Sequence, residues 1–229
     1  MPTILTPALL SGSCGKDSAL ALFHARAAGL DVRWQVTMLE ENGERSRSHG
    51  IPLDLVRAQA AAQGLELLAP AASWKTYEEA FTSALKDCAA KGCAVAVFGD
   101  IDLEAHRGWE EKVCAGAGLQ AALPLWLRSR EDLSREVLQR GYRAVVVCTD
   151  SRYLGDEFCG RLYDEEFLAS LPSGVDLCGE NGEFHTFVFD GPGFTAPVPW
   201  RLAQFADYTA PAEYGGVRYR FAQLALALA

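Results

Sequence analysis

The chain lacks the features that would set it apart from ordinary globular proteins. No stretch approaches the roughly 18 uninterrupted apolar residues that a membrane-spanning helix needs. No basic segment followed by an apolar core marks a secretory leader, and there is no internal repeat. With 229 residues, of which 49% are hydrophobic and 22% charged, the sequence predicts a cytoplasmic globular protein with no membrane partner.

Basic side chains are in short supply. Lys and Arg number 21 against 30 Asp and Glu, which leaves a formal net charge of −9. A protein that holds nucleic acid by its phosphates normally presents a basic surface. The charge balance therefore argues against nucleic acid as a partner, whereas self-association into a homo-oligomer stays open.

Paired cysteines are also missing. The seven cysteines are odd in number, and none forms a Cys-x-x-Cys pair of the kind that binds zinc or acts as a redox dithiol. Several lie in apolar runs, as Cys148 does after Val145–Val147. We predict buried, reduced thiols.

What the first half does contain is a regular alternation of short apolar runs and longer amphipathic runs. The apolar runs predict strands at 8–10, 32–39, 65–68, 94–98 and 121–123, and the amphipathic runs predict helices at 17–28, 52–63, 76–91 and 104–117. Strands separated by helices of this length indicate an α/β fold with a parallel, Rossmann-like sheet. Ligands of such sheets bind beyond the carboxyl ends of the strands.

The segment Pro124–Trp126 is a plausible boundary, which predicts one domain at 1–125 and a second, smaller α/β domain at 126–229. Helices are expected at about 130–140 and 164–170, with a strand at 144–148 and an apolar run ending at Asp190. In the aromatic tail, alternation over 217–221 favours an edge strand.

The most informative run is Ser11-Gly12-Ser13-Cys14-Gly15-Lys16-Asp17-Ser18, between the first predicted strand and helix. A glycine-bearing turn there presents backbone N–H groups at a helix N-terminus, where they favour phosphate. Lys16 adds a cation, and Asp17 can hold Mg²⁺ on the same phosphates. The run is not a Walker A loop, because Gly12 lies only three positions before Gly15 and Asp follows the lysine.

A second polar cluster lies near the end of the chain, in Cys178-Gly179-Glu180-Asn181-Gly182-Glu183-Phe184-His185-Thr186. Side chains alternate along a strand, so Glu183 and His185 are expected on one face. With Glu180 and Asn181, they could bind an acceptor, hold a second Mg²⁺ or move a proton. A polar hairpin turn is the alternative.

Smaller signals lie between these two segments. Gly99-Asp100 ends the fourth predicted strand, where the Asp100 carboxylate could bind Mg²⁺. His49 could approach a ligand or lie in an exposed loop. His106 and Arg107 face either the cleft or solvent, and Trp109 is expected in the core or at the domain interface.

The first loop resembles the PP-loop, Ser-Gly-Gly-Lys-Asp-Ser, of the ATP pyrophosphatases, with Cys14 at the position of the first glycine. The loop, Gly99-Asp100 and Gly-Glu-x-Gly-Glu-aromatic-x-Thr over 179–186, in this order, resemble the diphthine–ammonia ligase (diphthamide synthase) family. The resemblance covers roughly residues 8–194. It implies a nucleotide α-hydrolase (HUP-type) domain followed by a substrate domain.

The resemblance also implies a reaction. ATP would be split between its α and β phosphates, a carboxylate acceptor would be adenylated, and ammonia or an amine would displace AMP. Lys16, Asp17 and His185 would be catalytic, and Asp17 and Asp100 would hold Mg²⁺. ATP would be bound by Ser13, Cys14, Gly15, Lys16, Asp17, Ser18, Gly99 and Asp100, and the acceptor by Glu180, Asn181, Glu183 and His185.

Departures from the family pattern limit the choice of acceptor. Asn181 replaces a glycine, Phe184 a tyrosine and His185 a glutamate, which resembles a bacterial branch of the family, and bacteria do not make diphthamide. The resemblance therefore supports the ATP chemistry more strongly than it supports diphthine as the acceptor. The alternatives are a PP-loop tRNA-modifying enzyme or sulfurtransferase, which would need a cysteine, and a non-catalytic ATP- or AMP-binding regulator.

Overall fold

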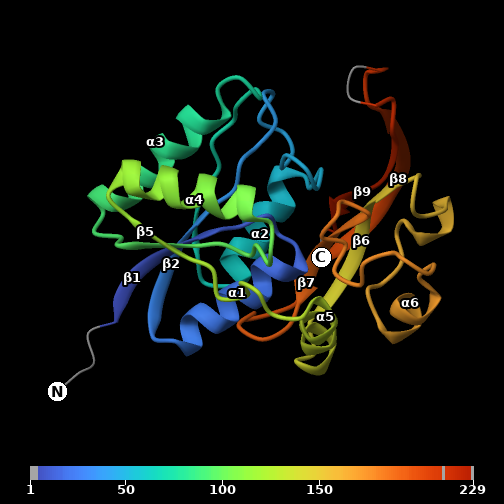
Figure 1. Ribbon diagram of the computed structural model, residues 1–229, viewed down its shortest axis with the longest axis horizontal. Helices are drawn as coiled ribbons and strands as arrows, with labels where there is room; N and C mark the ends of the chain where they lie inside the picture. The colour runs from blue at the N-terminus through green and yellow to red at the C-terminus, as the bar shows by residue number, and fades with distance from the viewer. Residues whose placement is uncertain (1–4, 213–214, 228–229) are drawn as a thin grey trace.

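The computed structural model describes residues 5–212 and 215–227. The ends of the two predicted domains, at 1–4 and 228–229, lie outside this part of the chain. Two sheets lie side by side in Figure 1, the first formed by the N-terminal half and the second by the C-terminal half.

The first sheet is parallel throughout and has the strand order β3-β2-β1-β4-β5. Its strands are β1 (Thr6–Ser11), β2 (Leu30–Val36), β3 (Glu66–Leu68), β4 (Val95–Val97) and β5 (Gln120–Ala122). The helices between them are α1 (Lys16–Ala27), α2 (Leu53–Ala62), α3 (Tyr77–Ala90) and α4 (Glu104–Ala117). The predicted Rossmann-like architecture is confirmed.

Both faces of this sheet are covered, and β1 shows how. Its side chains alternate, so that Ala8 and Leu10 pack into the cluster that contains α1, whereas Leu9 packs into the cluster under α3 and α4. All three are buried almost completely. Burial on both faces is why the sequence of β1 reads as a continuous apolar run rather than an alternating one.

The second sheet is antiparallel and has the order β7-β6-β9-β8. Its strands are β6 (Arg143–Asp150), β7 (Phe184–Asp190), β8 (Trp200–Thr209) and β9 (Arg218–Leu226). The helical elements of this half are α5 (Arg130–Gln139), the 3₁₀ turn η1 (Asp156–Phe158) and α6 (Glu165–Ser170). The second, smaller part therefore mixes helices and strands, as expected.

The prediction of an edge strand at 217–221 is wrong. Strand β9 lies between β6 and β8, and β8 is the outer strand. The polar residues of β9 that suggested an edge are partnered across the sheet, since Arg218 and Arg220 pair with Asp207 on β8. Strand β8 itself was not singled out, because most of its side chains are exposed and give no alternating pattern.

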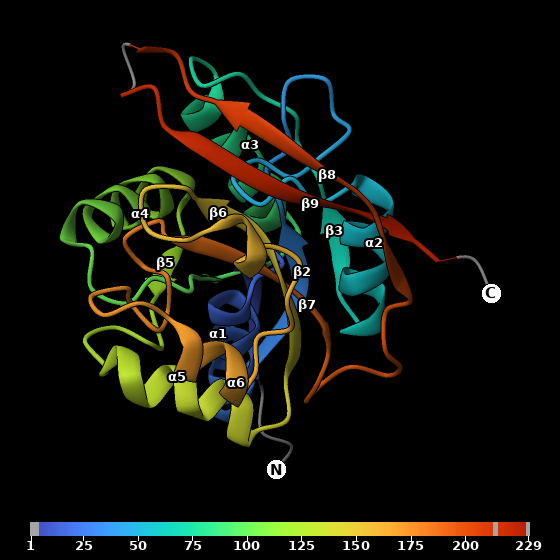
Figure 2. The ribbon, with the colours of Figure 1, turned by 90° about the vertical axis from the view of Figure 1, so that its right-hand side faces the viewer.

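One apolar cluster runs through both halves of the molecule. It joins β1 and α1 to residues of α5, β6 and α6, so that α1 packs against the second half as well as its own sheet. Backbone contacts continue the connection, with Val188 N–H of β7 donating to the Cys14 carbonyl at 3.0 Å. Figure 2 shows α1 beside β7. The boundary near Leu125–Trp126 stays a prediction.

Two further expectations can be compared with the described residues. No helix in them has the length and apolarity needed to cross a membrane. All seven cysteines are free and buried, which confirms the prediction of unpaired, buried thiols.

Candidate active site

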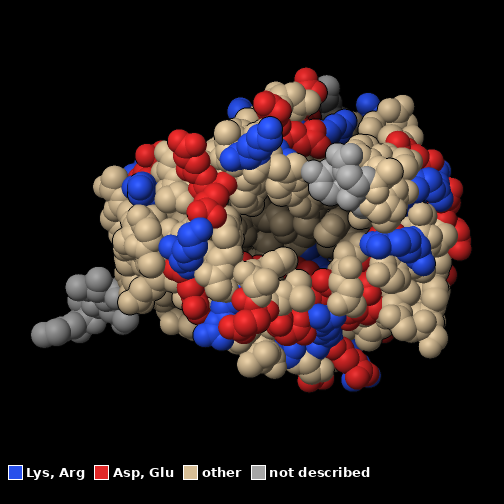
Figure 3. Space-filling model, turned by 45° about the horizontal axis from the view of Figure 1, so that its top comes forward, with Lys and Arg blue, Asp and Glu red and all other residues tan. Residues whose placement is uncertain are grey.

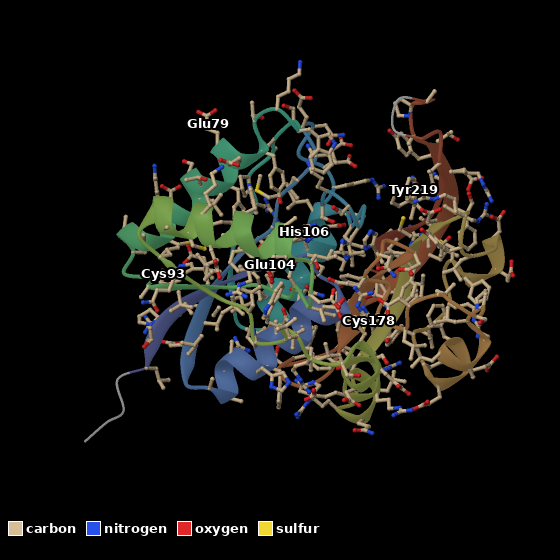
Figure 4. The ribbon with its side chains drawn as sticks, in the orientation of Figure 1. Glu79, Cys93, Glu104, His106, Cys178 and Tyr219 are labelled. Carbon is tan, nitrogen blue, oxygen red and sulfur yellow. The ribbon has the colours of Figure 1, made fainter. Side chains whose placement is uncertain are left out.

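A cavity of about 700 Å³ opens between the two halves. The space-filling view in Figure 3 shows this face hollowed at its centre, with Asp and Glu side chains gathered along the rim. Figure 4 shows Glu104 and His106 at the end of α4 that faces the second half, and Cys178 across from them. The cavity wall includes the predicted site residues Ser13, Lys16, Asp17, Ser18, Gly99, Asp100, Glu180 and His185, but not Cys14, Gly15, Asn181 or Glu183.

Residues 11–18, which we call the phosphate loop, offer backbone donors to this cavity. The Lys16 N–H is already engaged, since it donates to Thr186 Oγ1 of β7 at 3.1 Å. The next two first-turn N–H groups, of Asp17 and Ser18, have no partner within the helix and donate to no other protein atom in the described part of the chain. They lie where the helix dipole favours an anion.

The Lys16 side chain is buried in the wall below the loop. Its Nζ donates to Asp17 Oδ2 at 2.7 Å and to the carbonyl of Cys178, and it lies 5.7 Å from the ring centroids of Tyr163 and Phe184. Burial alone would favour the neutral amine, but the Asp17 carboxylate outweighs it and raises the pKa of Lys16. The ammonium therefore stays charged beside the cavity.

The two carboxylates predicted to hold Mg²⁺ both line the cavity. Asp17 Oδ1 is buried without a protein partner, and Asp100 Oδ1 is 2.7 Å from His106 Nδ1. No group of three or more His, Cys, Asp or Glu side chains in the described part of the chain is arranged to hold a metal. Mg²⁺ usually takes one or two carboxylates and completes its shell with water and phosphate oxygens, so this pair fits it.

Glu110 is a cavity residue that sequence reasoning missed. It is 4% exposed, and its Oε2 has no protein partner. Burial, and then the nearby Asp100 carboxylate, raise the pKa of Glu110 well above its usual range, which favours its neutral form. One signal could have found it: Glu110 follows His106 by four positions, which places both on one face of α4.

Aromatic side chains form another part of the wall, and sequence reasoning did not predict this. Trp74, Tyr77 and Trp109 line the cavity. Trp109, expected in the core, also packs against Phe81, with 5.4 Å between ring centroids. Trp74 is 73% exposed, and the Arg47 guanidinium lies over its ring at 4.4 Å.

Two glycines permit close approaches around the phosphate loop. A Cβ on Gly99 would lie 2.9 Å from the Ser18 backbone nitrogen, so the end of β4 packs directly against the first turn of α1. A Cβ on Gly15 would lie 2.9 Å from His49 Nε2. A side chain at position 99 would push on the Ser18 N–H, and one at position 15 would push on the His49 ring.

The acceptor turn, which we define as residues 176–183, uses most of its polar groups internally. The Glu183 carboxylate is 1% exposed and accepts hydrogen bonds from the Asp176 N–H, the Asn181 N–H and Asn181 Nδ2 at 3.0 to 3.1 Å. The expected shared face with His185 is therefore wrong, because Glu183 precedes β7 and folds back into the turn. Asn181 and Glu183 form its framework rather than the cavity wall.

Glu180 and His185 do reach the cavity. Burial, and then the negative charge of Asp17, raise the pKa of Glu180 to about 7. Burial, and then the positive charge of Lys16, lower the pKa of His185 to about 4. His49 also faces the cavity, and its ring centroid is 4.5 Å from that of His185. Both imidazoles are neutral at pH 7, since burial also lowers the pKa of His49.

Sequence comparisons identify the family. The family model described as the diphthamide synthase N-terminal domain matches residues 5–121, and that of the diphthamide synthase C-terminal domain matches residues 129–200. The chain belongs to the diphthamide synthase family. Both motif segments lie within the matched regions.

The curated relatives of this family member are named diphthine–ammonia ligase. The human protein is 34% identical over 122 residues, which cover 51% of this chain and 45% of the human one. The mouse protein is 33% identical over 118 residues, covering 48% and 44%. The chain thus matches less than half the length of these relatives.

A solved structure from Methanocaldococcus jannaschii, described as the predicted subunit of a tRNA methyltransferase, aligns with a TM-score of 0.40 and 12% identity. The alignment covers 81% of this chain and 96% of that one. A resemblance at this level says nothing about function.

Cys14, which replaces the family's glycine, lies behind the loop. Its φ of 69° is in the left-handed region, which explains why glycine suits the position. Its side chain packs in the apolar cluster with Leu55 and Phe187. Burial raises the pKa of the thiol to about 12, so Cys14 is not an activated nucleophile. Cys178, on the cavity wall, has a pKa raised by burial to about 12 as well.

Proposed function

We propose that this protein is an ATP-dependent ligase that adenylates a carboxylate and joins it to ammonia or an amine. The observation that carries the proposal is a single cavity that brings the free N–H groups of the phosphate loop and the Lys16–Asp17 pair opposite Glu180 and His185. Family membership supports the same chemistry.

In the first step a carboxylate oxygen of the acceptor attacks the α-phosphorus of ATP. An O–P bond forms, the bond from the α-phosphorus to the bridging oxygen breaks, and pyrophosphate leaves. The carboxylate is already ionised at neutral pH, so no base is needed. The N–H groups of Asp17 and Ser18 bind phosphate oxygens, and the Lys16 ammonium stabilises charge on the leaving group.

Asp17 and Asp100, which both line the cavity, would hold Mg²⁺, with Asp17 Oδ1 the unpartnered atom. When bound, the ion would neutralise part of the phosphate charge. Glu110, whose raised pKa favours the neutral acid, would add no further negative charge beside Asp100. His106 fixes the other side of the Asp100 carboxylate.

In the second step the amine nitrogen attacks the acyl carbon, a C–N bond forms, the C–O bond to AMP breaks, and the nitrogen gives up a proton. His185 was the expected acceptor of that proton. With its pKa at about 4 it is a weak base, whereas Glu180 titrates near neutrality and matches the task better. We assign the proton to Glu180 and contact with the acceptor to His185.

The acceptor is a carboxylate, and diphthine is one candidate. The relatives carry its name, but this chain matches less than half of their length and has Asn181 and His185 in the acceptor motif. The thiols of Cys14 and Cys178 are buried and unactivated, which favours the ligase over a sulfurtransferase.

The test is product analysis with ATP labelled in its α-phosphate, Mg²⁺ and ammonium chloride. One arm contains elongation factor 2 carrying diphthine, and a second contains a panel of small carboxylic acids labelled with ¹⁸O in the carboxyl group. The proposal expects AMP, pyrophosphate and the transfer of one ¹⁸O atom to AMP.

Formation of ADP and phosphate would contradict the proposal, because it means cleavage at the γ-phosphate. Stoichiometric binding of unchanged ATP with every acceptor would favour a nucleotide-binding regulator. Turnover that depends on tRNA and a cysteine would favour the tRNA-modifying alternative. A Lys112→Ala variant, which is altered at an exposed lysine, serves as the control for effects of substitution and purification alone.

A further inference from the structure

Arg130, the first residue of α5, joins two loops that come from different halves of the chain. Its Nε and Nη2 donate to the two carboxylate oxygens of Asp102 at 2.8 and 2.6 Å. Its Nη1 donates to Asp176 Oδ2 at 3.0 Å and to Asn181 Oδ1 at 3.1 Å. Arg130 does not line the cavity, so it reaches a bound ligand through these partners and through its positive charge near Glu180.

Each partner is close to a group that faces the cavity. Asp102 follows Asp100 by two residues in the loop after β4. Asp176 also accepts the N–H of Glu180 at 2.8 Å, which fixes the backbone of that residue. Arg130 therefore connects the loop that carries Asp100, on the nucleotide side, with the turn that carries Glu180, on the acceptor side.

The geometry points to Arg130 as a positioning residue that makes nucleotide binding order the acceptor turn. This inference rests on the proposed function, because it requires nucleotide and Mg²⁺ at Asp100. When nucleotide and Mg²⁺ fix the loop after β4, they also fix Asp102 and the guanidinium bound to it. The Nη1 group of Arg130 then holds residues 176–183 through Asp176 and Asn181. By linkage, nucleotide and acceptor then each strengthen the binding of the other.

The bonds from Arg130 to Asp102, Asp176 and Asn181, which we call the Arg130 clamp, require an arginine. The planar guanidinium makes two parallel bonds to one carboxylate while a third nitrogen reaches the turn. A lysine carries the same charge on one nitrogen and cannot span both loops in this way. Replacing Arg130 with lysine therefore separates the effect of the positive charge from that of the guanidinium geometry.

The experiment is hydrogen–deuterium exchange on the whole protein, free and with α,β-methylene-ATP and Mg²⁺. In the unaltered protein we expect the analogue to slow exchange at both 99–103 and 176–183. In Arg130→Gln the protection should persist at 99–103 and fall at 176–183 by about five- to tenfold, the size of a modest coupling. Arg130→Lys should behave like Arg130→Gln.

Arg135→Gln is the matched control, since Arg135 lies on the same helix and pairs only with Glu131 in the described part of the chain. It should leave both segments unchanged. Asp102→Asn weakens the clamp from its other end and should uncouple the turn in the same way, which guards against misfolding of a single variant. Equal protection in Arg130→Gln and Arg135→Gln, or full rescue by Arg130→Lys, would overturn the inference.

Failure of the proposed function gives a different result. If calorimetry shows that the unaltered protein does not bind the analogue, nucleotide binding is wrong and so is the coupling that depends on it. The clamp itself is then judged in the free protein. There Arg130→Gln must speed exchange at 176–183 more than Arg135→Gln does, and equal rates would show that Arg130 positions nothing.

Discussion

The phosphate loop and the acceptor turn face the same cavity but are built in opposite ways. The loop presents backbone N–H groups, and its one long side chain, Lys16, is buried and tied to Asp17 and the Cys178 carbonyl. The turn presents side chains, but Glu183 and Asn181 hold the turn together while Glu180 reaches the cavity. Residues that are adjacent in a motif therefore have different roles. Substitutions in the two segments should impair the protein for different reasons.

The largest effect is expected from Lys16→Ala. The change removes the cation near the leaving group and leaves Asp17 as a poorly solvated carboxylate without its partner. We expect turnover, measured as pyrophosphate release, to fall at least about 100-fold, and the free energy of unfolding to fall by about 3 kcal/mol. Lys112→Ala, at an exposed site, should change neither. Retained turnover in Lys16→Ala would mean that the loop is not a catalytic phosphate site.

Next comes a pair of matched substitutions within the acceptor turn. Glu183→Gln places an amide among three N–H donors, and we expect urea unfolding to show a loss of about 2–3 kcal/mol. Glu180→Gln should leave stability at pH 8 unchanged or slightly higher, because it removes a charge in a partly buried site, yet it should impair turnover. If both variants lose the same stability, the division between framework and cavity residues within the turn is wrong.

The pH profile separates Glu180 from His185. The pKa of Glu180 in the folded protein, about 7, lies above its usual 4.5. Its contribution to stability is therefore present below about pH 4.5 and is lost as the pH rises through 7, while its capacity as a base grows.

We expect kcat/KM for the amine, expressed per concentration of unprotonated amine, to rise about tenfold per pH unit below 7 and to level off above it. Glu180→Gln should abolish this limb, measured from pH 5.5 to 8.5. His185→Gln should keep it, since His185 titrates near 4. A limb that disappears in His185→Gln and survives in Glu180→Gln would reverse the assignment.

The smallest effect is expected at Cys14. Cys14→Gly relieves a left-handed backbone strain of about 1 kcal/mol and loses buried side-chain packing of similar size, so urea unfolding should change by less than about 1 kcal/mol. Turnover should persist. Cys14→Val, with a branched side chain at the same φ, should lose more stability. Loss of turnover in Cys14→Gly with the fold intact would revive the sulfurtransferase alternative.

Much of this fold could be predicted from the sequence, because both signals used are local. Apolar runs of strand length between amphipathic runs specify the parallel sheet, and the glycine-bearing run after β1 specifies a helix N-terminus at the ligand-binding edge. Placing Gly99-Asp100 at the end of β4 needed only the rule that parallel strands share one carboxyl edge. Lys16, Asp17, Asp100, Glu180 and His185 accordingly line one cavity.

The remainder depends on contacts that no local pattern encodes. Periodicity predicts the direction of a side chain in a strand, but Glu183 lies in a turn, where hydrogen bonding decides. In the sequence, Glu110 resembles any charged residue of an exposed helix. Its burial in the cavity wall beside Asp100 is seen only in the folded structure. The replacement of glycine by Asn181 becomes intelligible once Arg130 is seen to bind its side chain.

The hydrogen bond from Val188 to the Cys14 carbonyl has a consequence for how this family can change. It covers part of the open edge of β7 with the phosphate loop, so that the strand after the acceptor turn and the loop support each other. Strand β7 transplanted without the loop would expose more of its unpaired edge. In any recombination or design, the loop and the strand are best moved as a pair.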